Sequence, residues 1–535
     1  MATTLENRIA TDAKVLRSYL GGKWQMGEER GAPLVNPCDG TVLAWASSKG
    51  LDLKAAIDHS RSVGGPELRK LSYSQRAELL GRIADLLASR RDAWYEIERK
   101  NSGNTKADAA IDVDGAIFTL KYFAKSGAKL GDAHLLRDGS PMRLARDQNF
   151  QGLHVGAPLD GVAVHINAFN FPAWGLWEKA AVSLLAGVPV LSKPATSTAW
   201  LAQEMVAAVI EAGILPPGAL SILCGSASDL LDHLRLGDVV AFTGSAETGA
   251  GVRQHPRIQQ QGVRVNIEAD SLNAALLGPD STPGSTAFDF FIREVVREMT
   301  TKTGQKCTAI RRVLVPAQHA GATTDAISAA LSEVVVGNPA NPAVTMGPVV
   351  NMAQRKSVEE GIRKLSQQAG IVYQPRSFAP VDASLDQGAF VAPTLMKVSS
   401  SGEGEIVNEL EVFGPVATII PYHDQQEAFA VARRGGGSLA ASVFSSDTAF
   451  LAEAAAALGT THGRLLLVDP SIGESQTGHG IVLPSLMHGG PGRAGGGEEL
   501  GGLHGLWFYH QRVAIQGSTA TLAALVAQAA DPSAE

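Results

Sequence analysis

Val162-Ala163-Val164-His165-Ile166 is the first of five short β-rich runs in the middle of the chain, and Val263-Arg264-Val265-Asn266-Ile267 is the last. Helical patterns separate the runs, so strand and helix alternate throughout this region. This alternation predicts right-handed strand–helix–strand crossovers and a parallel sheet covered by helices on both faces. The runs are 162–166, 188–191, 220–223, 239–242 and 263–267, and the helical patterns lie near 173–186, 198–212 and 227–235.

Distinctive residues follow each of these predicted strands. Open parallel sheets bind ligands at the carboxyl ends of their strands, so these residues are the first candidates for a functional site. In chain order they are Asn170-Phe171-Pro172, Lys193-Pro194-Ala195-Thr196, Gly225, Thr243-Gly244-Ser245 and Glu268.

Upstream of the sheet, residues 1–70 are predicted to form short strands and loops. Ser72 and Gln75 have the spacing of a helix capping box, and apolar residues recur after them at helical intervals. A long amphipathic helix is therefore predicted to begin here, followed by two further helical segments up to about residue 130. The polar stretch 140–160 is predicted to form a hairpin that projects from the domain.

Downstream of the sheet, strand and helix patterns alternate again. A strand at 312–316 and helices at 325–335 and 354–368 predict a second α/β domain. The segment from Gly489 to Gly505 contains nine glycines, both ends included, and they predict a loop that wraps closely around another part of the protein or a ligand. Its charged residues either shape a substrate entrance or only keep the loop soluble; they are Arg493, Glu498 and Glu499. A strand is predicted to resume at 506–509.

Composition excludes several classes of function. The chain has 535 residues and a net charge of −7, without the basic run that nucleic-acid binding requires. Three cysteines scattered over the whole length argue against a disulfide framework and for a reducing compartment. No signal peptide and no run of apolar residues long enough to span a membrane is visible, so we expect a cytoplasmic protein of two or three domains.

Cys307, in the turn Thr303-Gly304-Gln305-Lys306-Cys307-Thr308, is a candidate nucleophile. A thiolate is the reactive form of cysteine, and a glycine-bounded turn can expose it. Lys302 and Lys306 flank the cysteine, and we expect them to stabilise its negative charge. A lone cysteine in an intracellular protein is more often a small buried apolar residue than a nucleophile, so the turn alone does not decide its role.

Six motifs at predicted strand or helix ends carry a resemblance: Phe169-Asn170-Phe171-Pro172, Lys193-Pro194, Phe242-Thr243-Gly244-Ser245 with Gly249, Glu268, Gly304-Gln305-Lys306-Cys307 and Glu411-Val412-Phe413-Gly414-Pro415. With them the chain resembles the aldehyde dehydrogenase superfamily from about residue 15 to residue 517. The resemblance implies an α/β fold with a Rossmann-like cofactor domain (1–139 and 161–279), an α/β catalytic domain (280–488) and a small β oligomerisation element (140–160 and 506–535). It also places the glycine-rich loop 489–505 near the active site.

The resemblance implies that Cys307 attacks the carbon of an aldehyde. The Asn170 amide and the backbone N–H of Cys307 are then expected to hold the oxyanion. Glu268 is expected to activate the water that hydrolyses the resulting thioester, a task for which burial should raise its pKa toward neutrality. Without the resemblance, Asn170 would be interpreted as a turn residue and Glu268 as a surface carboxylate. No metal site is expected.

The resemblance also implies a nicotinamide cofactor. Gly244 and Ser245 open the helix after the fourth strand, where free backbone N–H groups suit a pyrophosphate. Lys193 is expected to reach the adenosine ribose, and Glu411 the nicotinamide ribose. Further expected contacts to the cofactor are Phe169, Thr196, Gly225, Gly249 and Phe413.

Thr196 bears on the choice of cofactor. Many NAD-preferring relatives have a glutamate at this place, which binds both ribose hydroxyls and would repel a 2′-phosphate. A threonine can instead donate a hydrogen bond to that phosphate, beside Lys193. The sequence therefore predicts NADP, with NAD as the alternative.

Departures from the family pattern narrow the expected substrate. Glu268 is followed by Ala269-Asp270-Ser271-Leu272-Asn273 rather than by Leu-Gly-Gly, and the segment from His488 to Glu499 also differs. Both stretches resemble the branch that oxidises CoA-linked semialdehydes in aerobic aromatic-acid breakdown. One member of that branch is fused to a hydratase domain, for which this chain is too short. We therefore expect the substrate to be the CoA-linked semialdehyde formed in benzoate degradation.

Three other functions stay open: a general aliphatic aldehyde dehydrogenase, a CoA-acylating dehydrogenase, and a catalytically silent family member that serves as a structural or binding protein. Glu268 argues against the acylating type, which has little use for a water-activating base. Family members pair through a projecting hairpin and through C-terminal strands, here near 506–516. A homodimer is therefore expected, with a tetramer as the alternative.

Overall fold

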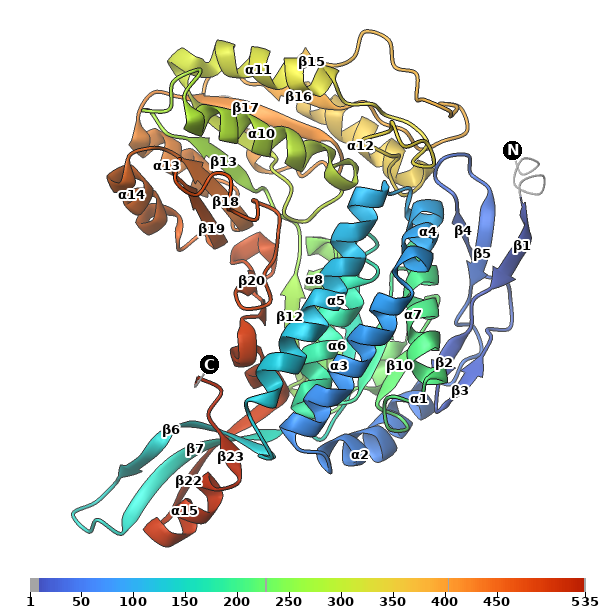
Figure 1. Ribbon diagram of the computed structural model, residues 1–535, viewed down its shortest axis with the longest axis vertical. Helices are drawn as coiled ribbons and strands as arrows, with labels where there is room; N and C mark the ends of the chain where they lie inside the picture. Colours follow the sequence, from blue (N-terminus) through green and yellow to red (C-terminus); the bar gives the residue numbers. More distant parts are fainter. Residues whose placement is uncertain (1–8, 227–228, 403, 534–535) are drawn as a thin grey trace.

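The computed structural model describes residues 9–226, 229–402 and 404–533. Figure 1 shows three parts along the long axis: a sheet domain with its helices in the middle, a second sheet domain at one end, and an arm of β-strands at the other. Both large sheets have seven strands. The chain therefore has the α/β fold that the alternation of strands and helices predicts.

The predicted parallel sheet lies in the middle of the molecule, with the strand order β12-β11-β8-β9-β10-β2-β3. The five strands from β12 to β10 run parallel to one another. They are β8 (Ala163–Ile166), β9 (Val190–Lys193), β10 (Leu220–Ile222), β11 (Val239–Thr243) and β12 (Arg264–Glu268). From β8 the chain continues to β9 on one side and later to β11 on the other, so β8 marks the point where ligands bind in such sheets.

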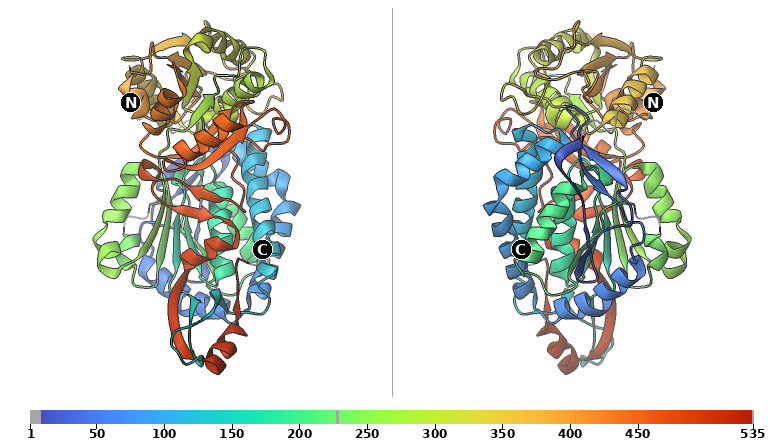
Figure 2. Two further views of the ribbon diagram at one scale, coloured as in Figure 1. Left: turned by 90° about the vertical axis from the view of Figure 1, so that its left-hand side faces the viewer. Right: turned by 90° about the vertical axis from the view of Figure 1, so that its right-hand side faces the viewer.

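Helices cover both faces of this sheet. Figure 2 shows α8 and α9 on one side of it and α3, α5 and α6 on the other. The Ser72 capping box is confirmed, because the Ser72 side chain accepts from the Gln75 backbone while the Gln75 side chain accepts from the Ser72 backbone. The helices are α3 (Tyr73–Ser89), α4 (Arg91–Ser102), α5 (Lys106–Ala128), α6 (Trp174–Ala186), α7 (Ala199–Glu211), α8 (Ala246–Gln254) and α9 (Pro256–Gln261).

Two predictions about this domain need correction. Residues 53–69 are helical rather than loops, because Asp52 caps a helix whose buried face is Leu53, Ala56 and Ile57. The helix predicted at 227–235 begins outside the described residues, and its described part holds only a short 3₁₀ helix, η3 (Leu230–His233). The first elements are β1 (Ile9–Val15), β2 (Ser18–Leu20), β3 (Lys23–Gln25), β4 (Ala32–Val35), β5 (Val42–Ala46), α1 (Leu53–His59), the π-helical turn η1 (Ser60–Gly64) and α2 (Gly65–Arg69).

The second sheet has the order β15-β16-β17-β14-β13-β18-β19. Its strand β13 (Ala274–Leu277) pairs with β14 and β18, so the predicted boundary at 279/280 lies on the wrong side of this strand. The other strands are β14 (Arg312–Pro316), β15 (Gly370–Tyr373), β16 (Thr394–Lys397), β17 (Val416–Tyr422), β18 (Ser438–Phe444) and β19 (His462–Val468). Its helices are α10 (Thr286–Thr300), α11 (Ala320–Ser332), α12 (Met352–Leu365), α13 (Gln425–Arg433) and α14 (Thr448–Leu458).

The arm is a four-stranded sheet with the order β22-β7-β6-β23. The predicted hairpin is present, but it begins earlier than residue 140, because β6 (Leu135–Arg143) pairs with β7 (Phe150–Pro158). The strand predicted at 506–509 is instead the end of a 3₁₀ helix, η8 (Gly502–Tyr509). The C-terminal part of the arm consists of β22 (His510–Ser518), α15 (Thr519–Val526) and β23 (Ala529–Ala530).

The glycine-rich segment is a hairpin rather than a plain loop. Strands β20 (Met487–Gly489) and β21 (Glu498–Leu500) pair antiparallel, and a 3₁₀ turn, η7 (Gly492–Ala494), lies between them. Gly495 has a φ of 107°, and a Cβ there would lie 2.2 Å from the carbonyl oxygen of Ile267. Only glycine lets the hairpin approach β12 this closely.

No helix in the described ranges is long and apolar enough to cross a membrane.

Candidate active site

A strained turn presents Cys307 between the two domains. After α10 the chain forms the 3₁₀ segment η4 (Thr301–Gly304), in which Lys302 and Thr303 have left-handed φ values of 50° and 55°. Such conformations are costly for residues other than glycine and concentrate at functional sites. The Asn273 amide donates to the carbonyl oxygen of Cys307 at 2.7 Å, which fixes the backbone that carries the thiol.

Two cavities meet at Cys307. The larger has a volume of about 580 Å³ and is lined by residues of both domains. The other is a pocket on the side of α6, lined among others by Phe171, Trp174, Glu178 and His488. Five residues line both cavities: the three predicted catalytic residues Asn170, Glu268 and Cys307, together with Ala168 and Thr243.

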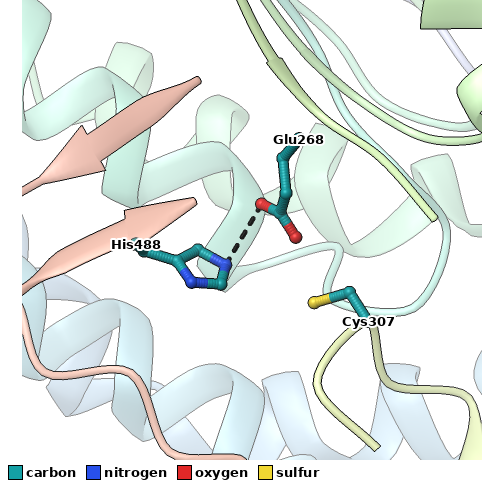
Figure 3. A group of neighbouring side chains, drawn as sticks. All are labelled: Glu268, Cys307 and His488. Atoms are coloured by element: carbon teal, nitrogen blue, oxygen red, sulfur yellow. Dashed lines mark ion pairs between the residues drawn. The ribbon is translucent and has the colours of Figure 1, made fainter. Parts of the chain in front are cut away.

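Glu268, at the end of β12, forms a buried ion pair with His488 of the glycine-rich hairpin. Nε2 of His488 lies 3.2 Å from Oε2 of Glu268 (Figure 3). Burial acts to raise the pKa of Glu268, but the charge and hydrogen bond of His488, together with the charge of Lys179 and a hydrogen bond with Cys307, outweigh burial and lower it. The expected rise of this pKa toward neutrality is therefore wrong for the site as it stands. The reason is a countercharge from a residue far away in the sequence.

The surroundings of Cys307 oppose the loss of its thiol proton. Burial and the neighbouring Glu268 carboxylate raise its pKa well above the ordinary value. Lys302 and Lys306 do not stabilise the negative charge of the thiolate as expected, because each is buried in its own ion pair. Nζ of Lys302 lies 2.8 Å from Glu98, and Nζ of Lys306 lies 2.7 Å from Glu298.

A charged cluster behind Glu268 was not predicted. Nζ of Lys179 lies 2.9 Å from Glu178 and 3.1 Å from Glu499, and oxygens of Glu178, Glu268 and Glu499 lie within 4.8 Å of one another. Burial raises the pKa of Glu499 to about 7. The only signal in the sequence was the pair Glu178-Lys179 inside the otherwise apolar α6, and a long-range approach to Glu499 cannot be derived from it.

The charged residues of the glycine-rich segment lie in different surroundings. Glu499 points inward to Lys179, Glu498 is exposed, and Arg493 lines the larger cavity. Nη1 of Arg493 donates to the carbonyl oxygen of Glu409 at 2.7 Å. Neither of the two alternatives, a substrate entrance or solubility alone, therefore describes all three residues.

Most of the predicted cofactor residues line the larger cavity. Ser245 caps α8 by accepting from the Thr248 N–H at 3.2 Å. The rings of Phe169 and Phe413 meet edge to face, with centroids 5.7 Å apart. Burial raises the pKa of Glu411 to about 7, although Arg311 lies 3.3 Å away. The predicted residues at this cavity are Phe169, Lys193, Thr196, Gly244, Ser245, Glu411 and Phe413.

Two predicted cofactor residues do not line the larger cavity. Gly225 has a φ of 120°, and a Cβ there would lie 2.6 Å from the backbone nitrogen of Ser48. A Cβ on Gly249 would lie 2.9 Å from the Ile267 side chain. Both glycines allow close packing, of a loop against its neighbour and of α8 against the sheet.

Comparisons with known proteins agree with this geometry. A family model described as "Aldehyde dehydrogenase family" matches residues 24–511. The 3,4-dehydroadipyl-CoA semialdehyde dehydrogenase of Aromatoleum evansii is 52% identical over 477 residues, which are 89% of this chain and 93% of that protein. The retinal dehydrogenase 2 of Mus musculus is 27% identical over 445 residues, which are 82% of this chain and 81% of that protein.

Solved structures share the fold. A putative aldehyde dehydrogenase from Burkholderia cenocepacia matches with a TM-score of 0.81 and 24% identity, over 94% of this chain and 97% of that one. A betaine aldehyde dehydrogenase from Staphylococcus aureus, solved in complex with NAD+, matches with a TM-score of 0.81 and 23% identity, over 94% of this chain and 95% of that one. At these identities the likeness shows the fold alone.

Proposed function

Because the chain belongs to the aldehyde dehydrogenase family of oxidoreductases, we propose that it oxidises a CoA-linked semialdehyde to the carboxylic acid with NADP. The substrate we propose is 3,4-dehydroadipyl-CoA semialdehyde, in the aerobic breakdown of benzoate and related aromatic acids. The observation that carries this proposal is the 52% identity to a 3,4-dehydroadipyl-CoA semialdehyde dehydrogenase over 89% of the chain.

The first half of the proposed reaction takes place at Cys307. The thiol gives up its proton to water, the sulfur bonds to the aldehyde carbon, and the carbonyl oxygen becomes an oxyanion. The Asn170 amide and the Cys307 backbone N–H hold this oxyanion, and removing one such donor typically costs about 3 kcal/mol. When bound, the nicotinamide would supply the acceptor for the hydride that leaves the same carbon, and a thioester on Cys307 would remain.

The second half needs Glu268. Its carboxylate takes a proton from water while the water oxygen attacks the thioester carbon. The carbon–sulfur bond breaks, the sulfur of Cys307 is released as a thiol once it regains a proton, and the product is a free acid. Glu268 lines both cavities and lies next to Cys307, which is the placement that both contacts require.

The larger cavity fits a dinucleotide. Its volume of about 580 Å³ is within the usual range for such sites, and the capped N-terminus of α8 opens onto it. Glu411 supplies a buried carboxyl group for a ribose hydroxyl, and Lys193 and Thr196 line the same cavity, which supports the proposed contact with a ribose phosphate. The structure of the Staphylococcus aureus protein in complex with NAD+ supports a nicotinamide cofactor of this kind.

Thr196→Glu is expected to reverse the cofactor preference. A carboxylate beside a 2′-phosphate costs several kcal/mol, so kcat/KM for NADP should fall about 100-fold or more, while that for NAD should stay or rise. Initial rates measured over a range of each cofactor check this. Thr196→Gln is the matched control, because it adds similar bulk without charge. Unchanged kinetics with NADP in Thr196→Glu would show that this position does not face the phosphate.

The proposed substrate is tested by comparing a CoA-linked six-carbon semialdehyde with free aliphatic aldehydes of matched length. Much faster formation of NADPH with the CoA-linked substrate is expected. Equal or faster rates with free aldehydes would indicate a general aliphatic aldehyde dehydrogenase instead. Dependence of turnover on free CoA would indicate the acylating type, and no activity across the series would indicate a silent family member.

We also propose that the protein is a cytoplasmic homodimer that associates through the arm. Strand β22 is an edge strand of the arm sheet, and β19 is an edge strand of the second sheet. Edge strands with free backbone groups invite pairing with another chain. A molar mass twice that of one chain, measured by light scattering in solution, is expected.

A further inference from the structure

His488 belongs to a buried triad that no predicted mechanism uses. One oxygen of Glu268, the sulfur of Cys307 and a ring nitrogen of His488 all lie within 4.8 Å of one another. The side chains of Glu268 and His488 are only 4% and 5% exposed. Figure 3 shows the carboxyl group between the ring and the thiol, with one oxygen paired to the ring and the other on the side of the sulfur.

This arrangement provides a positive charge beside two groups that would both be negative, the Cys307 thiolate and the Glu268 carboxylate. A cysteine nucleophile must become a thiolate, and a carboxylate at this distance in a buried site opposes a second negative charge. Without a countercharge, the proton would stay on the thiol or move to the carboxylate. The lysines next to Cys307 in sequence do not supply the countercharge, because they are paired with Glu98 and Glu298.

We propose that His488 is a positioning residue whose positively charged ring lets the Glu268 carboxylate and the Cys307 thiolate exist side by side. Holding Oε2 also leaves the second oxygen of Glu268 facing the space where water and thioester must meet. The ring acts on the reaction through Glu268. This inference rests on the proposed role of Cys307 as nucleophile.

The charges around the ring favour its protonated form. Burial acts to lower the pKa of His488, and so does Arg464 on β19, but Glu268 on β12 and Glu178 on α6 outweigh them and raise it. Lys179 and Glu499 are the other charged groups of the cluster, and they are paired with each other. The raised pKa extends to higher pH the range in which the ring carries its proton, and the ring loses that proton as the pH rises through the raised value.

The test is the pH dependence of alkylation of Cys307 by iodoacetamide, followed by mass spectrometry of the peptide that contains it. His488→Gln keeps a hydrogen-bond donor to Glu268 but cannot carry the charge, and His488→Phe removes both. Both are expected to raise the thiol pKa by at least about one unit, which slows alkylation at pH 7 about tenfold. His462→Gln is the matched control, because burial holds the pKa of His462 at about 4 and leaves that ring neutral. It should leave the thiol pKa unchanged.

A second pair of variants separates the charge from a structural effect. In Glu268→Gln the ring has lost its counter-ion, so adding His488→Gln should no longer shift the thiol pKa. A wild-type thiol pKa in His488→Gln, or an equal shift with and without Glu268, would overturn the proposal. Cofactor binding and circular dichroism establish that each variant is folded. Alkylation requires no aldehyde, so these results do not depend on whether the proposed substrate is correct.

Discussion

Cys307→Ala is expected to lower kcat for aldehyde oxidation by at least about 10⁴-fold, because no other group can form the covalent bond that the reaction passes through. Cofactor binding should be retained, since the thiol is only one of many residues that line the larger cavity. Steady-state rates and cofactor titration by fluorescence measure the two quantities on the same preparation.

Cys38→Ala is the matched control for this variant. Cys38 is buried in a small apolar cluster with Val336, Met346 and Phe390, away from both cavities. The control should keep the parental kcat, with at most a modest loss of stability from the smaller side chain. Aldehyde oxidation by Cys307→Ala at a rate close to that of the parent would contradict the covalent mechanism.

Glu268→Gln is expected to separate the two halves of the reaction. The amide cannot take a proton from water, so steady-state turnover should fall by about 10²–10⁴-fold. Formation of the thioester does not require that step. Rapid mixing should therefore show a burst of reduced cofactor close to one equivalent per active site, followed by slow turnover.

The burst shows whether Glu268 acts before the thioester forms or only in its hydrolysis. Cys307→Ala should show neither burst nor turnover, which makes it the reference for the Glu268 variant. Absence of a burst in Glu268→Gln would mean that Glu268 is needed before the thioester forms, for example to take the proton of the thiol. Unchanged steady-state turnover would exclude Glu268 as the base that activates water.

The parallel sheet was predictable because its signals are local. Each strand from β8 to β12 is a short apolar run, and a helical pattern or a turn separates it from the next. The end of a strand is also where a ligand must bind, so Asn170 and Glu268 were candidates from their places in the chain, but only the family resemblance implied catalytic roles for them. The predictions for the arm and for the hairpin β20–β21 were less accurate, because the ends of these elements depend on partner strands from other parts of the chain.

The electrostatics of the site were not predictable. The pKa of Glu268 depends on His488, which belongs to a hairpin that reaches β12 only in the folded protein. Lys302 and Lys306 were expected to serve the thiol, because they are its neighbours in sequence. The fold pairs each of them with a buried carboxylate instead. Sequence distance says little about which charges meet in a core.

The chain passes from the first sheet to the second between Glu268 and Ala274, and between Val468 and Met487 it leaves the second sheet for the hairpin β20–β21, which packs against β12 of the first. Glu268 and Cys307 therefore stand on separate halves of the molecule. The proposed nucleophile and its base can act together only when the two halves are docked, so catalytic competence is a property of the docked pair and not of either sheet alone.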